Sequence, residues 1–180
     1  MKNHYLKFYH FIDNLNIKNI ENLHKNIGLI YRNYNKKPSE HEICKFKNYC
    51  KKNNKKFLIS NYHDLVNKHK LDGYYIPSFN KKKNYLINKN RKDFILIGSA
   101  HNIKEIRIKE KQGVSQIILS PIFKSTNSNR PLGLYRYNLL STQTKLPTIA
   151  LGGINKNNIK FLKIIKTKGF ASISYFKDKN

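Results

Sequence analysis

The sequence predicts an α/β protein, and within that class a compact (β/α)8 barrel of the TIM type with a short or missing final helix. Short apolar segments alternate with stretches of helical periodicity along the whole chain. Several of these segments, including 94–97 and 117–119, are apolar on both faces, as parallel strands covered by helices are. A doubly wound open sheet is the alternative, because 180 residues is a small number for a barrel.

Eight segments have the length and composition of strands. In chain order they are Lys7–Ile12, Ile27–Arg32, Lys56–Ile59, Gly73–Ile76, Phe94–Gly98, Gln116–Leu119, Thr148–Leu151 and Phe170–Ser174. Each is bounded by glycine, proline or polar residues, and eight is the number of strands that closes a barrel.

Three start signals place helices between the strands. Ser39 is followed three residues later by Glu42, the pattern of a capping box, and Asn102 with Glu105 is a weaker version of it. Asn155 is expected to cap a helix that runs to Lys168 and is closed by Gly169. Only residues 175–180 follow the last strand, so the final helix is expected to be vestigial or absent.

The chain is strongly basic, but its charge is spread evenly. There are 36 Lys and Arg against 10 Asp and Glu, a net charge of +26, and each half of the chain carries +13. Lysine outnumbers arginine 31 to 5, whereas proteins that read nucleic acids favour the bidentate guanidinium of arginine. We therefore expect a single domain over residues 1–180 that does not bind nucleic acid, with the Lys runs at 51–56 and 81–83 mostly solvated.

The sequence offers no signal for a membrane or a disulfide. The first residues lack the apolar run and cleavage site of a leader, and no segment has the roughly 18 consecutive apolar residues of a membrane helix. The expected location is the cytoplasm, with no membrane partner. Cys44 and Cys50 lie six residues apart in one predicted helix, a spacing that disfavours both a disulfide and a zinc site.

The segment 147–155 contains a candidate phosphate site. A buried strand ends in Gly152 and Gly153 before a helix start, so backbone N–H groups can approach an anion closely. Ser172 and Ser174 place hydroxyls at the end of the next strand, and the loops after strands seven and eight of a barrel commonly bind phosphate. A tight turn without a ligand is the alternative for the two glycines.

Two further segments carry candidate polar groups. Ser99 and His101 lie two residues apart at the end of the fifth strand and can face one substrate, although a histidine in this position can equally be structural. The loop 120–128 after the sixth strand is rich in hydroxyls and is flanked by Lys124 and Arg130, which suits an oxyanion or an ordinary surface loop.

Taken together, these motifs resemble the thiamine phosphate synthase/TenI family in order and spacing. The matching strings are Ser99-Ala100-His101, Ser120-Pro121-Ile122-Phe123-Lys124-Ser125, Leu151-Gly152-Gly153-Ile154 and Ile173-Ser174. Residues 94–176 carry most of the match, and the first half aligns more faintly through 29–32, 58–61 and 72–76.

The resemblance implies an enzyme that joins a pyrimidine diphosphate (HMP-PP) to a thiazole phosphate, releasing pyrophosphate with the help of Mg²⁺. By position, Gly152, Gly153, Ile173 and Ser174 would hold the thiazole phosphate, with Ser125, Thr126, Asn127 and Ser128 lining the same pocket. Arg32, Ser60 and Ser99 would face the pyrimidine diphosphate. The expected catalytic residues are Arg32, Ser99 and His101, and small phosphorylated molecules are the implied partners. A homodimer is also considered.

The sequence departs from the family where the metal would bind. The two metal-binding aspartates of the family fall on Asn61 and Asn80, and its diphosphate-facing lysines fall near Tyr34 and Ser128. Cations such as Arg32, Lys81, Lys82, Lys83 or Lys124 would then have to neutralise the diphosphate. A paralogue that binds a phosphorylated thiazole or thiamine phosphate without turnover is therefore the second interpretation. A TenI-type thiazole tautomerase is the third and weaker one, because Pro121 lies near the position of that branch's catalytic histidine.

Overall fold

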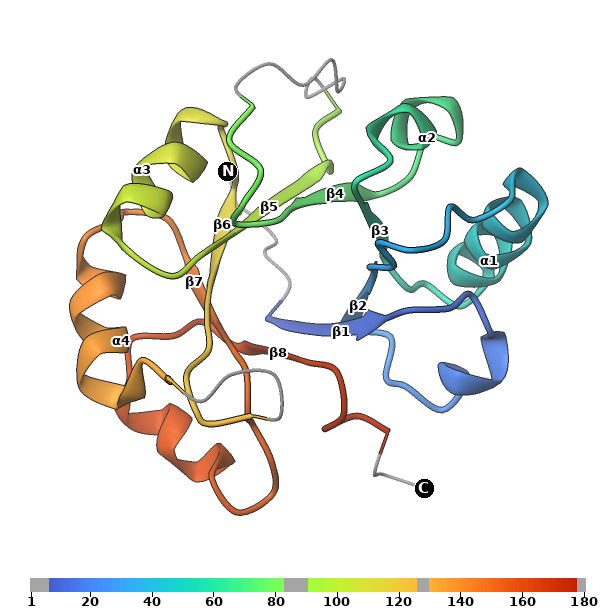
Figure 1. The fold of residues 1–180 in the computed structure, drawn as a ribbon. Helices are drawn as coiled ribbons and strands as arrows, with labels where there is room; N and C mark the ends of the chain where they lie inside the picture. Colours follow the sequence, from blue (N-terminus) through green and yellow to red (C-terminus); the bar gives the residue numbers. More distant parts are fainter. Residues whose placement is uncertain (1–6, 83–90, 126–129, 178–180) are drawn as a thin grey trace.

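The predicted barrel is confirmed. A computed structural model describes residues 7–82, 91–125 and 130–177, and in it eight parallel strands close in chain order, with β1 paired to both β2 and β8 (Figure 1). Pairing of Tyr9 with Ala171 closes the ring, which excludes the doubly wound open sheet. No helix within these ranges has the length and apolar character needed to cross a membrane.

The observed strands lie within two residues of the predicted ones at every boundary. They are β1 (Phe8–Ile12), β2 (Ile27–Tyr31), β3 (Phe57–Ser60), β4 (Gly73–Ile76), β5 (Ile95–Ala100), β6 (Gln116–Leu119), β7 (Thr148–Leu151) and β8 (Phe170–Ser172). Four α-helices cover them: α1 (Glu40–Lys52), α2 (His63–Lys68), α3 (Ile103–Lys111) and α4 (Gly133–Thr142). Two 3₁₀ helices, η1 (Ile17–Asn19) and η2 (Ile159–Ile164), complete the described elements.

Alternate residues of the strands fill the barrel interior, as the pleat requires. Every strand contributes at least one buried side chain to this inner core, which comprises Tyr9, Phe11, Ile30, Leu58, Tyr75, Ile97, Ile118, Ile149, Leu151 and Ala171. The intervening residues point outward and form a second core beneath the helices. The two cores explain why the strands are apolar on both faces.

Two of the three predicted helix caps form as expected. Ser39 and Glu42 exchange side-chain and backbone hydrogen bonds at the start of α1, and Asn102 Oδ1 accepts from the Glu105 N–H at the start of α3. These bonds satisfy N–H groups that have no partner within the helix. They fix where each helix begins relative to the strand before it.

The predicted helix from Asn155 to Lys168 is wrong. Asn155 Oδ1 accepts from the N–H groups of Asn157 and Asn158 and so starts a turn, but only the six-residue η2 follows. The Lys166 N–H donates to Asn138 Oδ1 of α4 at 2.7 Å, and the Lys168 N–H donates to the Thr148 carbonyl at 2.8 Å, so this stretch does not continue as a helix. Gly169 closes no helix; a Cβ there would overlap the Lys7 carbonyl.

An aromatic cluster packs outside the seam between β8 and β1. Phe176 stacks on Phe170 with ring centroids 5.3 Å apart, Tyr175 meets both rings edge-on, and His10 meets Phe176 at 5.7 Å. Residues 173–177 form a turn rather than a helix, as the sequence predicts. These rings therefore bury the outer face of this seam among themselves.

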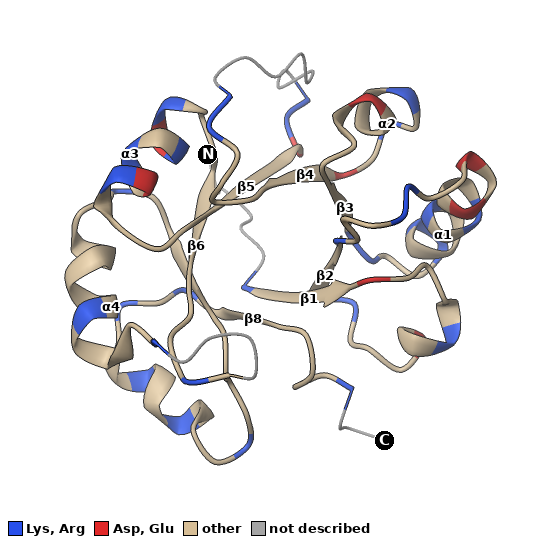
Figure 2. Ribbon diagram, viewed as in Figure 1, with Lys and Arg blue, Asp and Glu red and all other residues tan. Residues whose placement is uncertain are grey.

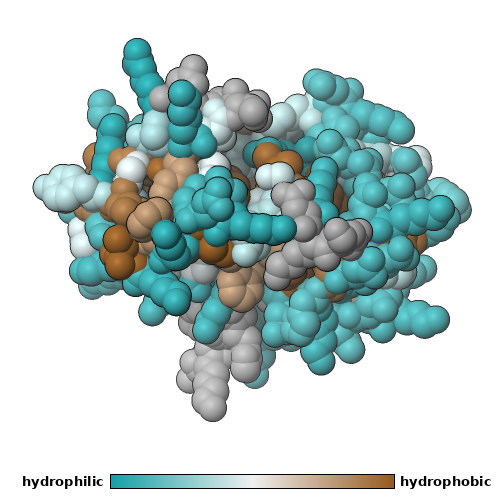
Figure 3. Space-filling view, turned by 90° about the horizontal axis from the view of Figure 1, so that it is seen from below, coloured by the Kyte–Doolittle hydropathy of each residue, from teal (hydrophilic) through white to brown (hydrophobic). Residues whose placement is uncertain are grey.

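The surface reflects the even spread of charge. Figure 2 shows Lys and Arg on α1, α3, α4 and the connecting segments, with acidic residues interspersed on α1, α2 and α3. One Lys of the run at 51–56 is not solvated: Lys55 is 5% exposed and donates to the Leu23 carbonyl. Figure 3 shows hydrophobic side chains gathered on the side of α4 and η2, where Tyr135, Leu139, Phe161 and Ile164 are exposed.

Candidate functional site

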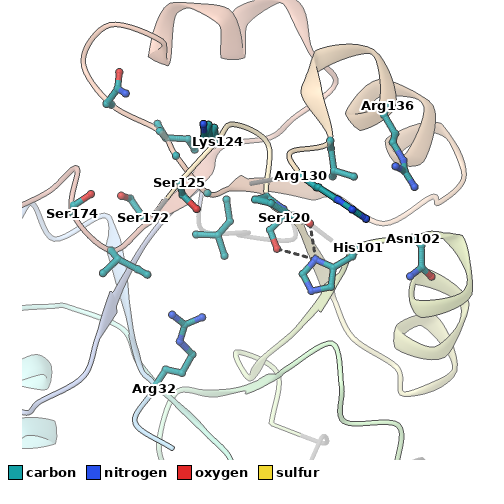
Figure 4. Close-up of a pocket in the computed structure, with 18 of the residues that line it drawn as sticks. Arg32, His101, Asn102, Ser120, Lys124, Ser125, Arg130, Arg136, Ser172 and Ser174 are labelled. Atoms are coloured by element: carbon teal, nitrogen blue, oxygen red, sulfur yellow. Dashed lines mark hydrogen bonds between the residues drawn. The ribbon is translucent and has the colours of Figure 1, made fainter. Parts of the chain in front are cut away.

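A cavity of about 1430 Å³ opens at the carboxyl ends of the strands. Its walls come from the segments after β2, β5, β6, β7 and β8 and from the first turn of α4, as Figure 4 shows. In a (β/α)8 barrel this end carries the functional site, because the βα loops converge there.

Seven of the predicted site residues line the cavity: Arg32, His101, Ser125, Gly152, Gly153, Ile173 and Ser174. Four others, Ser60, Ser99, Asn61 and Asn80, do not line it. Thr126, Asn127 and Ser128 fall outside the described residues, as does Lys83.

Gly152 and Gly153 join β7 to the wall formed by the loop after β6. Their φ angles are +103° and +67°, which L side chains rarely adopt. A Cβ on Gly152 would lie 2.7 Å from Pro121 Cβ, and one on Gly153 would overlap the Lys124 carbonyl. The Phe123 N–H donates to the Gly152 carbonyl at 3.0 Å. Glycine is therefore required both for the backbone conformation and for close contact between two walls of the cavity.

The end of β8 presents two serines to the same space. Ser172 is 5% exposed, and its hydroxyl accepts from the Tyr175 N–H at 2.9 Å. Ser174 lies in the following turn and is exposed, and Figure 4 shows both serines on the side of the cavity opposite Arg136. Glycine backbone and serine hydroxyls on adjacent strands form the arrangement predicted for a phosphate. The long helix expected after the glycines is replaced by the six-residue η2, so no long helix dipole points at this site.

Arg32 follows β2 and rises from the barrel floor into the cavity (Figure 4). Its guanidinium carbon lies 4.6 Å from the centre of the Phe11 ring, which in turn packs edge-on against Tyr75. Such a cation–π contact holds the side chain without neutralising it. The guanidinium can therefore bind an anion above.

Ser99 lies below this level, inside the barrel. It is 3% exposed, and its hydroxyl accepts a 2.9 Å hydrogen bond from Tyr75 Oη. Burial raises the pKa of Tyr75 to about 12, so the phenol stays protonated and keeps donating. Ser99 supports the floor beneath Arg32 rather than lining the cavity.

His101 is held at both ring nitrogens. Nδ1 lies 2.6 Å from the Ser120 carbonyl and must carry the proton, which leaves Nε2 to accept from the Ser78 hydroxyl at 2.9 Å. The ring thus links the ends of β4, β5 and β6. This geometry favours a positioning role over proton transfer.

The residues at the two predicted metal positions do not fit Mg²⁺. Both are neutral amides, and Mg²⁺ in proteins takes at least one carboxylate. The Asn80 side-chain oxygen accepts from the Lys82 N–H at 3.1 Å, and its carbonyl accepts from the Lys109 ammonium at 2.8 Å. Across the described ranges no group of three or more His, Cys, Asp or Glu is placed to hold a metal.

Lys109 is buried beneath the loop after β4. Its Nζ donates to the carbonyls of Pro77 and Asn80 and to Gln112 Oε1, at 2.7, 2.8 and 3.0 Å. Burial lowers the pKa of Lys109 to about 8, so the ammonium is still largely protonated at pH 7. A buried cation thus holds the backbone of the loop that carries Asn80.

Tyr34 and Arg136 are among the cavity residues that were not predicted as site residues. Tyr34 lines the rim and packs edge-on against Phe79 at 5.7 Å, and burial raises the pKa of Tyr34. Arg136 lies in the first turn of α4. Its signal was available, because Arg136 lies three residues after Gly133, close to the end of a βα loop, and these loops surround the mouth of a barrel.

These features define a (β/α)8 barrel with a cavity at the carboxyl ends of its strands that is lined by basic and hydroxyl side chains and built mainly on β2, β7, β8 and the loop after β6. Comparison of the chain with known proteins identifies its family within this class. The profile of the thiamine monophosphate synthase family matches residues 22–176. The chain belongs to this family.

Individual relatives agree. A thiamine-phosphate synthase of Fusobacterium nucleatum is 30% identical over 83% of this chain and 74% of its own length. The chain is 34% identical to a relative from Aquifex aeolicus and to a thiamine-phosphate synthase of Prochlorococcus marinus, but it spans only 64% and 37% of their lengths. The thiamine phosphate pyrophosphorylase of Pyrococcus furiosus has the same fold, with a TM-score of 0.72 and 20% identity over 94% of this chain and 86% of its own.

Proposed function

We propose that this chain is a thiamine phosphate synthase that joins HMP-PP to a thiazole phosphate and releases pyrophosphate. Family membership supports the reaction class. The observation that carries the proposal is the convergence of Gly152-Gly153, Ser174 and Arg32 on one cavity large enough for two phosphorylated rings. The Tyr34 ring at the rim offers an apolar surface to a flat heterocycle.

The proposed reaction needs no general base. The C–O bond to the diphosphate breaks and its electron pair leaves with pyrophosphate, while the lone pair of the thiazole nitrogen forms the new C–N bond. The protein's task is to hold two anions and their rings in line and to stabilise the charge that develops on the leaving diphosphate.

We assign the thiazole phosphate to the end of β7 and β8 and the diphosphate to the Arg32 side. The glycine turn and the serine hydroxyls suit the three oxygens of a monophosphate ester. The Arg32 guanidinium suits two oxygens of a diphosphate at once.

The test of the reaction is formation of thiamine phosphate from HMP-PP and thiazole phosphate, detected by chromatography. The test of the phosphate assignment is calorimetric titration of the wild type and the Ser174→Asp variant with thiazole phosphate. A carboxylate in this exposed position should repel the monophosphate and weaken thiazole phosphate binding about tenfold or more while leaving the thermal midpoint nearly unchanged. Unaltered binding by Ser174→Asp would remove the phosphate assignment.

Binding without turnover is the second candidate. Neutral Asn61 and Asn80 in place of carboxylates, with Lys109 beside Asn80, favour it. Calorimetric titration with thiamine phosphate, together with the product assay, separates the binding protein from the synthase. Thiamine phosphate binding with no product from the two substrates would support the binding protein, whereas product formation would exclude it.

A further inference from the structure

The arginines of this chain are concentrated at the cavity. Lysine is the default cation, at 31 residues to 5 arginines, yet three of the five arginines line this one cavity: Arg32, Arg130 and Arg136. The other two are used elsewhere, Arg91 on the Leu71 carbonyl and Arg107 on Glu110. A compositional bias that acts evenly along the chain would not concentrate arginine at one cavity. A binding site that requires the planar, bidentate guanidinium group explains this concentration.

The three guanidinium groups are not neutralised. Among the described residues that line the cavity there is no Asp or Glu. None of the three arginines forms an ion pair with the described part of the chain. Lys124 adds a fourth cation to the same walls, whereas Lys81 and Lys82 do not line the cavity. The cavity therefore carries an uncompensated positive charge that suits a polyanion.

Two backbone hydrogen bonds anchor the start of α4, which carries Arg136 in its first turn. The Leu132 N–H donates to the Pro121 carbonyl at 2.7 Å and the Gly133 N–H to the Ile122 carbonyl at 3.1 Å, which ties the start of α4 to the end of β6. In Figure 4 the Arg130 and Arg136 side chains extend toward the His101 and Asn102 side of the cavity, and Arg32 rises from below. Figure 4 shows Ser172 and Ser174 on the other side.

We propose that Arg130 and Arg136, together with Arg32, bind the diphosphate of the substrate and stabilise the leaving pyrophosphate without a divalent metal ion. This inference rests on the proposed function for the presence of a diphosphate in the cavity. The donor set supports it, because Asn61 and Asn80, at the positions that would hold Mg²⁺, are neutral amides, and the Asn80 carbonyl already accepts from the buried Lys109 ammonium. Three guanidinium groups supply the positive charge and the directed N–H donors that a metal would otherwise supply.

The experiment is calorimetric titration of the whole chain with inorganic pyrophosphate at physiological salt, first in EDTA and then with excess Mg²⁺. The variants are Arg130→Gln/Arg136→Gln and the control Lys104→Gln/Arg107→Gln, which also removes two positive charges but from α3, outside the cavity. Thermal unfolding of each variant verifies that it is folded.

We expect the wild type to bind pyrophosphate in EDTA, with Mg²⁺ changing the affinity less than threefold. The cavity double variant should bind about 100-fold more weakly, because it loses two sets of charge-assisted hydrogen bonds, and the control should change less than threefold. Binding that requires Mg²⁺, or equal losses in both double variants, would overturn the proposal.

A parallel assay of thiamine phosphate formation separates this inference from the proposed function. Product that forms only with Mg²⁺ would refute metal independence and leave the synthase assignment intact. Pyrophosphate binding in EDTA that depends on both arginines, with no product under any condition, would refute the synthase assignment and leave the anion site in place.

Discussion

The aromatic cluster outside β8 and β1 should contribute a large share of the stability of this fold, and Phe176→Ala tests it. Phe176 is 8% exposed and stacks on Phe170 at an interplanar angle of 7°. Truncating a buried Phe to Ala costs about 3–5 kcal/mol. A second cavity of about 410 Å³, lined in part by Leu23, Ile27 and Phe176, adjoins the ring, so water can enter the space that the variant creates. The cost should therefore lie at the low end, about 3 kcal/mol.

Urea unfolding followed by far-UV circular dichroism measures this loss, and the thermal midpoint should fall by about 6–12 °C. Tyr135→Ala is the matched control, because Tyr135 is also aromatic but 84% exposed on α4. It should change the unfolding free energy by less than about 0.5 kcal/mol. A loss of unfolding free energy in Phe176→Ala no larger than that of the control would refute the conclusion that this aromatic cluster stabilises the barrel.

Three further predictions follow from single side chains. Gly153→Ala should lower the unfolding free energy by about 2 kcal/mol and weaken thiamine phosphate binding, because it combines a positive φ with overlap of the Lys124 carbonyl. Gly133→Ala is the control, because Gly133 has a φ of +68° but lies in open space. It should cost only about 1 kcal/mol of unfolding free energy and leave thiamine phosphate binding unchanged in the same titrations. Burial lowers the pKa of His10 below 6.5, so below that pH the unfolded chain takes up a proton that the native state resists. The free energy of unfolding should therefore fall as the pH drops below 6.5. His10→Asn should flatten this part of the plot of unfolding free energy against pH. Lys109→Met should cost about 2 kcal/mol or more in urea unfolding, because it leaves the Pro77 and Asn80 carbonyls without their donor, and a neutral result would contradict the role of Lys109 in holding the loop after β4.

Local patterns in the sequence were sufficient for the scaffold. The strands were found because each buries both faces, which leaves continuous apolar runs such as Ile117–Leu119. The caps at Ser39 and Asn102 were found because a cap depends on residues only three positions apart. The helix after Asn155 was mispredicted because its backbone N–H groups bind Asn138 and Thr148, which are distant in sequence.

The sequence by itself determined the barrel, the glycine turn at 152–153 and the serines after it, because these depend on local periodicity and on a backbone conformation that only glycine adopts easily. The tertiary structure decided which cations share the cavity, that Ser99 lies beneath it and that Lys109 lies under the loop carrying Asn80. Such relations join residues on different strands and helices. Closure of the barrel brings these residues together, and local sequence patterns do not predict contacts between residues that are distant in the chain.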